Sequence, residues 1–595
     1  MNNTISAAMP QPAEVPRALE QDIEKHLSVE QNAHEVADDL KTDSDSASEQ
    51  NKQEGVRHAE AITQVWSKKL LWVMFVMLYL VTFIDALLQS VQSNLVPYIT
   101  SSFNQHGLLA TTSIVASVIG GVSKLTIAKI IDIWGRCEGF LFMLLLIVIG
   151  IIMKATCKNV EMYAAAHTLY WVGHLGMGYV IDVMLSDITT LKNRMVMFGI
   201  HMTPTIATVF AGSRIADLFY SNLNFRWAFG AFCIILVAFC LPVGAVFIYS
   251  QRKASRRGLI EKRVKTRSVF ESVKYYFIQF DVPGMVLTTA GWSLLLLPFS
   301  LAKTAPHGWS TGYIIAMIVL GVVCLVAFGV WEKYFATVAY LPFKFLQDRT
   351  ILGGCLLYGI MFISIYCWDS YYSSYLQVVH NLNITISGYV LNTFSLTSAF
   401  IGPFVGLLIR HTGEYKYTAL AGIPFCVLGT ALLIYFRHPG SDIGYLVMCQ
   451  VFNGISSGIW SLTTHIAIMA AVSHQEIAVV LAMIGLFGSI GAAIGLAIAG
   501  ALWTNILPHS LYTHLPEGSK GLVSKIYGSI VTQKSYPMGS PIRTAIIAAY
   551  GDVQRKMVIA GAAFTPLLLI CIVVWKRINL KTVDQTGQKK GNTVW

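Results

Sequence analysis

The chain has 595 residues, of which 54% are hydrophobic, 12% aromatic and only 13% charged. Soluble globular proteins carry about 25% charged residues, so this chain has too little polar surface to cover a water-soluble body of its size. The composition excludes a cytosolic enzyme, a disordered scaffold and a secreted disulfide-rich domain. It predicts a protein embedded in a membrane.

Charge divides the chain unevenly. Residues 1–66 contain 13 Asp and Glu against 5 Lys and Arg, a net charge of −8, and their polar composition predicts a disordered acidic tail without a cleavable signal peptide. The other 529 residues carry 38 Lys and Arg against 19 Asp and Glu, a net charge of +19. Ten cysteines lie scattered from Cys137 to Cys571 with no Cys-x-x-Cys pair, so they predict neither a disulfide framework nor a metal site.

Long apolar runs predict the membrane-spanning segments. A bilayer core of about 30 Å is crossed by about 20 apolar residues in an α-helix. Fourteen runs meet this requirement, and the Gly and Pro residues inside them are typical of tightly packed membrane helices. The expected spans are residues 70–92, 108–131, 138–155, 162–185, 195–217, 227–250, 282–301, 312–333, 350–371, 386–409, 417–436, 443–471, 477–501 and 557–577.

The distribution of basic residues predicts how the spans are oriented. With the N-terminus in the cytoplasm, the cytoplasmic loops hold 18 Lys and Arg and the outer loops hold 5, among them Lys154 and Arg437. Both termini are therefore expected in the cytoplasm. The strongest basic run, Arg252–Arg267, is typical of a cytoplasmic linker, which we favour over an anionic-lipid or nucleic-acid patch of the same composition.

Two long connections divide the expected spans into regions. The outer loop 502–556 is far longer than a connector and holds two short amphipathic stretches, near 522–532 and 541–553, so we expect a structured external cap. The expected regions are a disordered acidic tail 1–66, a six-helix bundle 67–250, a basic cytoplasmic linker 251–281, two inserted helices 282–333, helices nine to thirteen of a second bundle 334–501, the outer loop 502–556, a last helix 557–577 and a cytoplasmic tail 578–595.

A short motif recurs on the expected cytoplasmic side, after the second helix of each half. The first copy runs from Ala128 to Arg136 and the second from Gly406 to Lys416. Glycine permits close helix approach, and the charged side chains can bridge neighbouring helix ends. The motif resembles the loop signature of the major facilitator superfamily, Gly-x-x-x-Asp-Arg-x-Gly-Arg-Arg/Lys, with Ala128 in place of the first Gly and Arg410 in place of the acid in the second copy. The resemblance implies a gating motif made of Asp132, Gly135, Arg136, Gly406, Arg410 and Gly413.

Two further segments narrow the resemblance. Phe225-Arg226-Trp227 opens the sixth span and resembles the Arg-Trp entry of the fourteen-helix proton-coupled branch of this superfamily. The glycine ladder from Gly488 to Pro508, followed by a long tyrosine-bearing loop, is similar to the fungal siderophore-iron transporters. Glutathione/proton exchangers of yeasts share much of this pattern.

The resemblance covers about residues 66–580. It implies an all-α membrane protein of the major facilitator fold with fourteen transmembrane helices, arranged as two pseudo-symmetric six-helix bundles plus two inserted helices. Substrate would lie near the midplane, be exposed alternately to each side, and move with the proton gradient. The sequence contains no Gly-x-x-x-x-Gly-Lys-Ser/Thr motif, so transport driven by ATP has no support.

Three aspartates lie inside expected spans without a neighbouring base in the sequence: Asp85, Asp182 and Asp369. A charged Asp at a helix centre costs about 2.5–3.5 kcal/mol, so each should face a cavity or a partner. Because protonation removes the charge, we expect these residues to couple transport to protons. The alternative is a structural acid near the outer interface, and Asp369 is the nearest of the three to that surface.

Aromatic residues crowd the fourth span and the surroundings of Asp369. An interfacial belt would account for Tyr and Trp at this depth. Ligand contact is the alternative, because Tyr offers an apolar face and a hydroxyl donor to a large, nearly neutral hydroxamate iron chelate. The candidate substrate-binding residues are Tyr170, Trp171, His174, Tyr179, Tyr366, Trp368, Tyr371, Tyr372 and Tyr375, with Tyr527 and Tyr536 in the outer loop.

The remaining charged side chains and histidines do not predict a functional site. Arg214 and Asp217 close the fifth span, where a helix-end ion pair is favoured over a substrate gate. His167 and His174 lie seven residues apart on one helix, and no flavin or nicotinamide domain follows, so a haem-binding redox enzyme is a weak alternative. We expect no catalytic residue, no metal site and no cofactor, since the iron would be carried only as its chelate.

The resemblance, together with the three aspartates and the aromatic residues, implies a proton-coupled symporter that imports ferric hydroxamate siderophores by alternating access. The expected partners are a ferric siderophore, protons and the lipid bilayer, with no nucleic acid, and the protein is expected to be a monomer. The plasma membrane is favoured, and an endosomal or vacuolar membrane remains open. The main alternative is a proton antiporter that exports glutathione or a drug-like compound, because one protonatable site can drive either cycle.

Overall fold

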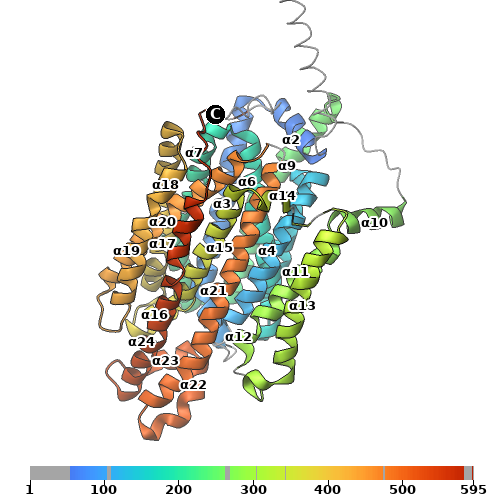
Figure 1. Ribbon diagram of the computed structural model, residues 1–595. Coiled ribbons are helices and arrows are strands. Elements are labelled where there is room, and N and C mark those ends of the chain that lie inside the picture. The colour runs from blue at the N-terminus through green and yellow to red at the C-terminus, as the bar shows by residue number, and fades with distance from the viewer. Residues whose placement is uncertain are drawn as a thin grey trace, which may run out of the picture. The chain divides into compact units, whose positions relative to one another are not determined.

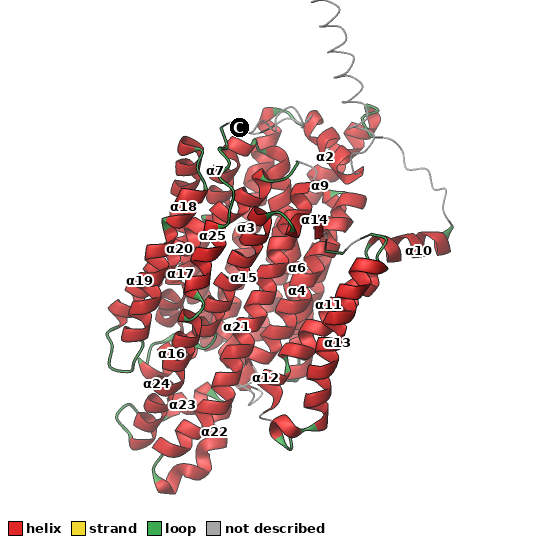
Figure 2. Ribbon diagram, viewed as in Figure 1, coloured by secondary structure: helices red, strands yellow, loops and turns green. Residues whose placement is uncertain are grey.

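A computed structural model describes residues 54–102, 109–260, 268–302, 305–338, 340, 341, 343–473, 476–581 and 593. Every regular element in these ranges is helical (Figure 2), which confirms the predicted all-α fold class. Residues 1–53 of the expected acidic tail, residues 261–267 of the expected linker and most of the expected C-terminal tail lie outside the described residues.

Twelve segments of the described chain are long and apolar enough to cross a membrane. Several consist of two helices in succession, as where Pro204 opens a new helix after Met202. The twelve are α3 (Lys68–Ser102), α4 (Leu109–Ile133), α5 (Arg136–Thr156), α7 with α8 (Leu191–Met202, Pro204–Asn222), α9 (Phe225–Arg256), α11 with α12 (Val282–Leu296, Pro298–Leu301), α13 (Gly312–Tyr334), α15 with α16 (Arg349–Asp369, Tyr372–Val379), α17 (Ile384–Thr412), α18 with α19 (Lys416–Leu420, Gly422–Phe436), α21 (Ile477–His514), and α24 with α25 (Pro541–Ala562, Thr565–Val573).

Two more long helices occupy the fourth and twelfth expected spans. They are α6 (Val160–Ile188), with 29 residues, and α20 (Ile443–Ala470), with 28 residues. Both are rich in polar side chains and are not among the twelve apolar segments. Each of the fourteen expected spans therefore coincides with helix, while the number of membrane crossings stays a prediction.

Several helices follow a short connection and begin at a residue whose polar side chain caps the helix N-terminus. The Asn159 side chain accepts a hydrogen bond from the Met162 amide at 2.9 Å, and Asn383 accepts one from the Ile386 amide at 2.8 Å. Such a cap contributes about 1 kcal/mol because it satisfies an amide that the first turn leaves unpaired. Sequence and local structure therefore agree at these helix starts.

The segment expected as a long outer loop is largely helical. Helix α21 continues to His514, and α24 already begins at Pro541. The buried residues Trp503, Leu507 and Leu511 extend the apolar face of α21 at helical spacing. The connection shortens to residues 515–540, which contain η5 (Glu517–Leu522), α22 (Val523–Gly528) and α23 (Ile530–Ser535).

The helices pack as two groups. In the first, α5 packs on α6 and α9, and α3 packs on α8; in the second, α15 packs on α21 and α24, and α17 packs on α20. Helices α4 with α21, and α17 with α7 and α8, join the two groups. The inserted hairpin of α11 and α13 contacts α4 from the outside (Figure 1).

The helix assembly has two ends, the linker face and the cap face. The linker face carries α2 (Glu54–Val65), α10 (Val269–Gln279) and the residues after α25; it is at the top of Figure 1. The cap face carries residues 515–540 and is at the bottom of Figure 1.

Candidate functional site

A cavity of about 620 Å³ lies between the two helix groups, in the half of the assembly toward the cap face. Helices α3, α4, α6 and α8 line one wall, and α15, α16 and α17 line much of the other. Its acidic lining residues are Asp85 and Asp369, one from each group. Uncharged polar side chains supply most of the other hydrogen-bonding groups, among them Gln89, Gln92, Ser117, Thr208, Asn392 and Ser395.

Asp85 is paired with a histidine from another helix. The Nδ1 atom of His174 on α6 lies 2.8 Å from the Asp85 Oδ2 atom. The His174 ring also stacks on Tyr170, with ring centroids 5.8 Å apart, which fixes its orientation. A carboxylate beside an imidazole can hold or release a proton at this wall of the cavity. Asp85 was a candidate for proton coupling and His174 a candidate for substrate binding, and the structure brings the two side chains together.

A buried lysine lies behind this wall. Lys154, expected in an outer loop, is fully buried because α5 continues to Thr156 and still faces α6 and α9. Its Nζ atom donates to Gln92 Oε1 at 2.6 Å and lies 3.7 Å from the ring centroid of Tyr170. Since Gln92 lines the cavity, Lys154 fixes the orientation of a cavity side chain.

The second helix group holds a similar arrangement. Arg437, also expected in an outer loop, is buried directly after α19 and lies 3.9 Å from the ring centroid of Tyr372. Its guanidinium donates to the Trp368 carbonyl oxygen and, at 3.3 Å, to Gln554 Oε1. Asp369 is its acidic neighbour.

The two arrangements occupy corresponding places in the two halves. Asp85 and Asp369 lie on the first helix of each group, counting the expected spans. Lys154 and Arg437 lie at the cap-face end of the third helix of each group, and each cation faces a tyrosine ring. Each half therefore presents one acid to the cavity and holds one buried cation close to it.

Asp182 lies elsewhere and is not among the residues that line the cavity. Its charged neighbour is Lys124 of α4, which the sequence analysis did not consider. Tyr358 and His465 from the second helix group lie next to this pair, with their ring centroids 5.7 Å apart. The Asp182–Lys124 pair is therefore part of the contact between the groups rather than of the cavity wall.

The candidate aromatic residues also divide into those that line the cavity and those that do not. Trp171, His174 and Tyr366 line the cavity. The others pack against protein: the Tyr179 hydroxyl donates to the Ala478 carbonyl at 2.7 Å, and Tyr371 stacks on Trp503 with centroids 3.9 Å apart. The remaining candidates are Tyr170, Trp368, Tyr372 and Tyr375, which are buried, and Tyr527 and Tyr536, which are half-buried in the 515–540 segment.

The first copy of the gating motif forms a buried ion-pair cluster at the linker face. Arg136 donates to Asp132 Oδ1 through Nη1 and to Asp187 Oδ2 through Nε, both at 3.1 Å. Asp187 comes from the end of α6 and was missed by the sequence analysis, because only the fold brings it to the motif. Gly135, with φ +124°, makes the turn between α4 and α5. The cluster ties α4, α5 and α6 together.

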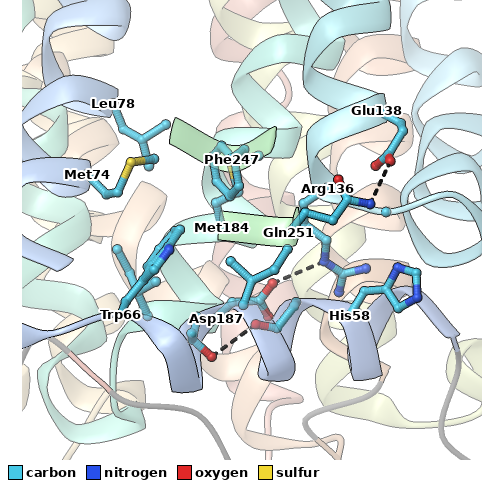
Figure 3. A pocket seen from close by; sticks show the side chains of 15 residues that line it. His58, Trp66, Met74, Leu78, Arg136, Glu138, Met184, Asp187, Phe247 and Gln251 are labelled. Carbon is cyan, nitrogen blue, oxygen red and sulfur yellow. Dashed lines mark hydrogen bonds and ion pairs between the residues drawn. The ribbon is translucent and has the colours of Figure 1, made fainter. Parts of the chain in front are cut away.

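Helix α2 covers this cluster. Figure 3 shows Arg136 and Asp187 in a small pocket that His58 and Trp66 also line. Beside them Gln251 of α9 donates to Glu138 Oε1 at 3.2 Å. The segment just before the first span is therefore a packed helix from Glu54 onward rather than part of a disordered tail.

The second copy of the motif is built differently. Gly413 caps α17 with φ +76°, and its carbonyl oxygen accepts a hydrogen bond from the Leu580 amide at 3.0 Å. Glu414 pairs with Arg577 at 2.8 Å. With Arg410 in place of the motif's acid, the end of α17 is held by the segment after α25. Gly406 contributes close packing, since a Cβ there would lie 2.5 Å from the Met195 carbonyl oxygen of α7.

Contacts between the helix groups also lie on the cap-face side of the cavity. The Tyr98 hydroxyl donates to Gln377 Oε1, and the Thr385 hydroxyl donates to Asp217 Oδ2 at 2.7 Å. Asp217 keeps the expected ion pair with Arg214 at 3.4 Å. Contacts therefore join the groups on both sides of the cavity.

Comparison with known proteins agrees with this geometry. The sequence profile of the Major Facilitator Superfamily matches residues 78–379 and 354–512. MFS siderochrome iron transporter 1 of Ajellomyces capsulatus is 54% identical over 573 residues, which are 96% of this chain and 98% of that protein. Siderophore iron transporter mirB of Emericella nidulans is 41% identical over 583 residues, or 98% and 96% of the two chains. Among solved structures, the peptide transporter POT in complex with sulfate has a TM-score of 0.50 at 15% identity and covers 82% of this chain and 99% of that one.

The chain belongs to the major facilitator superfamily, and its class is a multi-pass membrane transporter rather than an enzyme. Within the superfamily it belongs to the family of fungal siderophore-iron transporters.

Proposed function

We propose that this protein imports ferric hydroxamate siderophores by proton-coupled alternating access. The observation that carries the proposal is the cavity between the helix groups, into which Asp85 paired with His174 faces from one wall and Asp369 from the other. The names of the similar fungal proteins support the substrate class.

The cavity suits a large, nearly neutral ligand. Its volume of about 620 Å³ lies within the range of small-molecule sites. Amide and hydroxyl groups such as Gln89, Asn392 and Ser395 can bond the amide oxygens of a chelate, while Trp171 and Tyr366 offer flat apolar faces. The iron would stay with its chelator, so the proposal needs no resident metal. In the described residues no cluster of three or more His, Cys, Asp and Glu could hold one.

Protonation can couple this site to the membrane gradient. Asp85 and His174 form a carboxylate–imidazole pair, and uptake of a proton changes the charge of such a pair. Inward movement of one proton releases about 2.3 kcal/mol per 100 mV, which can drive one substrate molecule against its gradient.

The basic residues support an orientation with the linker face in the cytoplasm. Nine Lys and Arg lie between Arg252 and Lys274, in the connection that includes α10. Both termini are then cytoplasmic. The plasma membrane is the expected location, and an endosomal or vacuolar membrane fits the same chemistry. A monomer contains both walls of the cavity.

Uptake of a radiolabelled ferric hydroxamate into a host that lacks its own siderophore transporters tests the proposal. We expect accumulation that is faster at acidic external pH and abolished by a protonophore. The alternative, a proton antiporter that exports glutathione or a drug-like compound, predicts no chelate uptake and a proton-driven efflux of the other solute. That result would overturn the symporter proposal.

A further inference from the structure

Helix α10 of the linker face exposes an apolar stripe that no part of the described chain covers. Phe270 is 80% exposed, Val273 62% and Phe277 49%. At about 100° per residue these three side chains lie within one narrow sector of the helix. Lys274 lies next to this stripe, and Glu271 and Ser272 lie away from it.

The angle of α10 to the bundle is fixed by packing. Trp134, at the end of α4, contacts the rings of Tyr276 and Phe280, with centroids 5.8 and 6.3 Å apart. Asp281, with φ +45°, makes the turn into α11, and its Oδ1 atom accepts a hydrogen bond from Trp331 Nε1 at 2.8 Å. Figure 1 shows α10 running across the end of α11 rather than continuing it.

The length and place of α10 put its stripe at the level of lipid headgroups. Its 11 residues are too few to span a bilayer. After two intervening residues α11 begins, and α11 with α12 is long and apolar enough to cross a membrane. A short amphipathic helix that lies across the end of a spanning helix has its apolar side in the headgroup region. The exposed phenylalanines then face acyl chains rather than water.

Positive charge around α10 favours lipids with anionic headgroups. The last turn of α9 and the turn after it expose Arg252, Arg256 and Arg257. Four more basic residues follow in the sequence before Ser268. Arg252 and Arg256 also line an open groove of about 570 Å³ together with Trp134, the residue that contacts α10. A dense basic segment beside an interfacial helix attracts anionic headgroups by about 1 kcal/mol per residue, and the attraction ends within a Debye length.

We propose that the cytoplasmic linker is in addition an interfacial anchor, in which α10 with Arg252, Arg256, Arg257 and Lys274 binds the anionic cytoplasmic leaflet. The apolar stripe inserts between lipids, and the arginines and lysines hold anionic headgroups. The anchor fixes the level of the linker between the two helix groups, so that their relative movement takes place against a fixed point in the membrane. The alternative occupant for the basic residues, which the test distinguishes, is the acidic sequence 1–53.

A fluorescent label tests the anchor in the full-length protein. The native cysteines are buried or half-buried, so a water-soluble maleimide dye labels an introduced exposed cysteine selectively. Phe270→Cys places the label on the stripe, and Ser272→Cys, about 200° around the helix, is the matched control. In nanodiscs with about 30% phosphatidylserine, we expect quenching by spin-labelled lipid to be at least about threefold stronger at position 270 than at position 272.

Three comparisons decide the outcome, and none requires substrate, so they are independent of the proposed function. Equal quenching at both positions would overturn the anchor. The same signal in pure phosphatidylcholine would overturn its selectivity for anionic lipid, whereas loss of the difference in an Arg252→Gln, Arg256→Gln, Lys274→Gln variant would support it. Quenching that appears only after residues 1–53 are deleted would show that the acidic tail occupies this surface, and would overturn the proposal for the full chain.

Discussion

At the scale of single residues, the cavity combines a titratable pair with buried cations that have few polar partners. Asp85 and His174 come from α3 and α6, and the Asp85 Oδ2 and His174 Nδ1 atoms lie 2.8 Å apart at the cavity wall. Lys154 lies behind the same wall and is bonded to Gln92. Charges in this low-dielectric setting interact strongly, so a substitution at one of these residues should change the interaction energies of the others.

We expect Asp85→Asn to abolish proton-dependent accumulation while the protein still exchanges labelled for unlabelled substrate. At 100 mV the roughly 2.3 kcal/mol carried by one proton sustains an accumulation of about fifty-fold, which this variant should lose. Uptake and counterflow in proteoliposomes measure both quantities. Glu161→Gln, at an exposed acid on the helix that carries His174, is the control and should accumulate normally. Unchanged accumulation in Asp85→Asn would remove this residue from the coupling mechanism.

Gln92 and Lys154 should show strong coupling in a double-mutant cycle. Gln92→Leu leaves a buried ammonium without its hydrogen-bond acceptor and should lower the free energy of unfolding by about 1.5–3 kcal/mol. The double variant with Lys154→Met should recover most of this loss, because an apolar side chain of similar length replaces the charge.

Thermal unfolding of the purified protein in detergent measures these effects. Lys158→Met, at an exposed position one turn further along the chain, should leave the stability unchanged. Additive losses in the Gln92 and Lys154 variants would show that the bond contributes little.

At the scale of elements, ion pairs between the ends of neighbouring helices stabilise the linker face. The turn at Gly135 places Arg136 at the start of α5, within reach of Asp132 on α4 and Asp187 on α6. Helix α2 covers this cluster. This short motif therefore joins the ends of three helices beneath a fourth. Its contribution to stability depends on the backbone turn that places Arg136 near both acids.

Gly135→Ala should destabilise the turn between α4 and α5 and the ion pairs that Arg136 makes there. Its φ of +124° is strained for any residue with a Cβ, and the added atom would lie 2.7 Å from Glu138 Oε2. We expect a loss of about 1–3 kcal/mol in unfolding free energy and slower transport. Gly230→Ala in α9, where a Cβ would meet nothing within 4 Å, is the matched control and should be neutral or slightly stabilising. Equal melting temperatures for the two variants would contradict the strained turn.

At the scale of the whole described chain, two groups of helices meet on both sides of one cavity. On the linker side α7 and α17 approach so closely that their backbones touch at Gly406. On the cap side the groups are joined by hydrogen bonds, such as that from Thr385 to Asp217. The proposed alternating access requires each set of contacts to break while the other holds, so we expect each set to contribute only a few kcal/mol.

Gly406→Ala should therefore shift the population toward conformations that are open at the linker face. The contact is with a backbone carbonyl, which cannot yield unless the helices separate. A destabilisation of about 1.4 kcal/mol would lower the ratio of closed to open forms about tenfold. Accessibility of a cysteine at Met195 to a water-soluble reagent, with and without Gly406→Ala, measures the shift. Gly329→Ala in α13, where a Cβ meets nothing within 4 Å, should leave the accessibility unchanged, and an unchanged value for Gly406→Ala would show that this contact does not control opening.

The sequence by itself determined the fold class, the position of every long helix in the described chain and the three aspartates within those helices, because these depend on local hydropathy and helical periodicity. It also located the Arg136 motif and the basic linker. Helix ends were less well determined: α21 and α24 extend into the segment expected as a loop, since their apolar faces pack on each other there.

Only the tertiary structure decided which of these residues act together. Asp85 lies 89 positions from His174 in the sequence, Lys154 lies 62 from Gln92, and Asp187 lies 51 from Arg136. A one-dimensional pattern holds no information about such partners, because they depend on the angles and depths at which helices cross. For the same reason Lys154 and Arg437, which a count of charges assigns to loops, are buried beside the cavity: whether a helix end is exposed is determined by its neighbours.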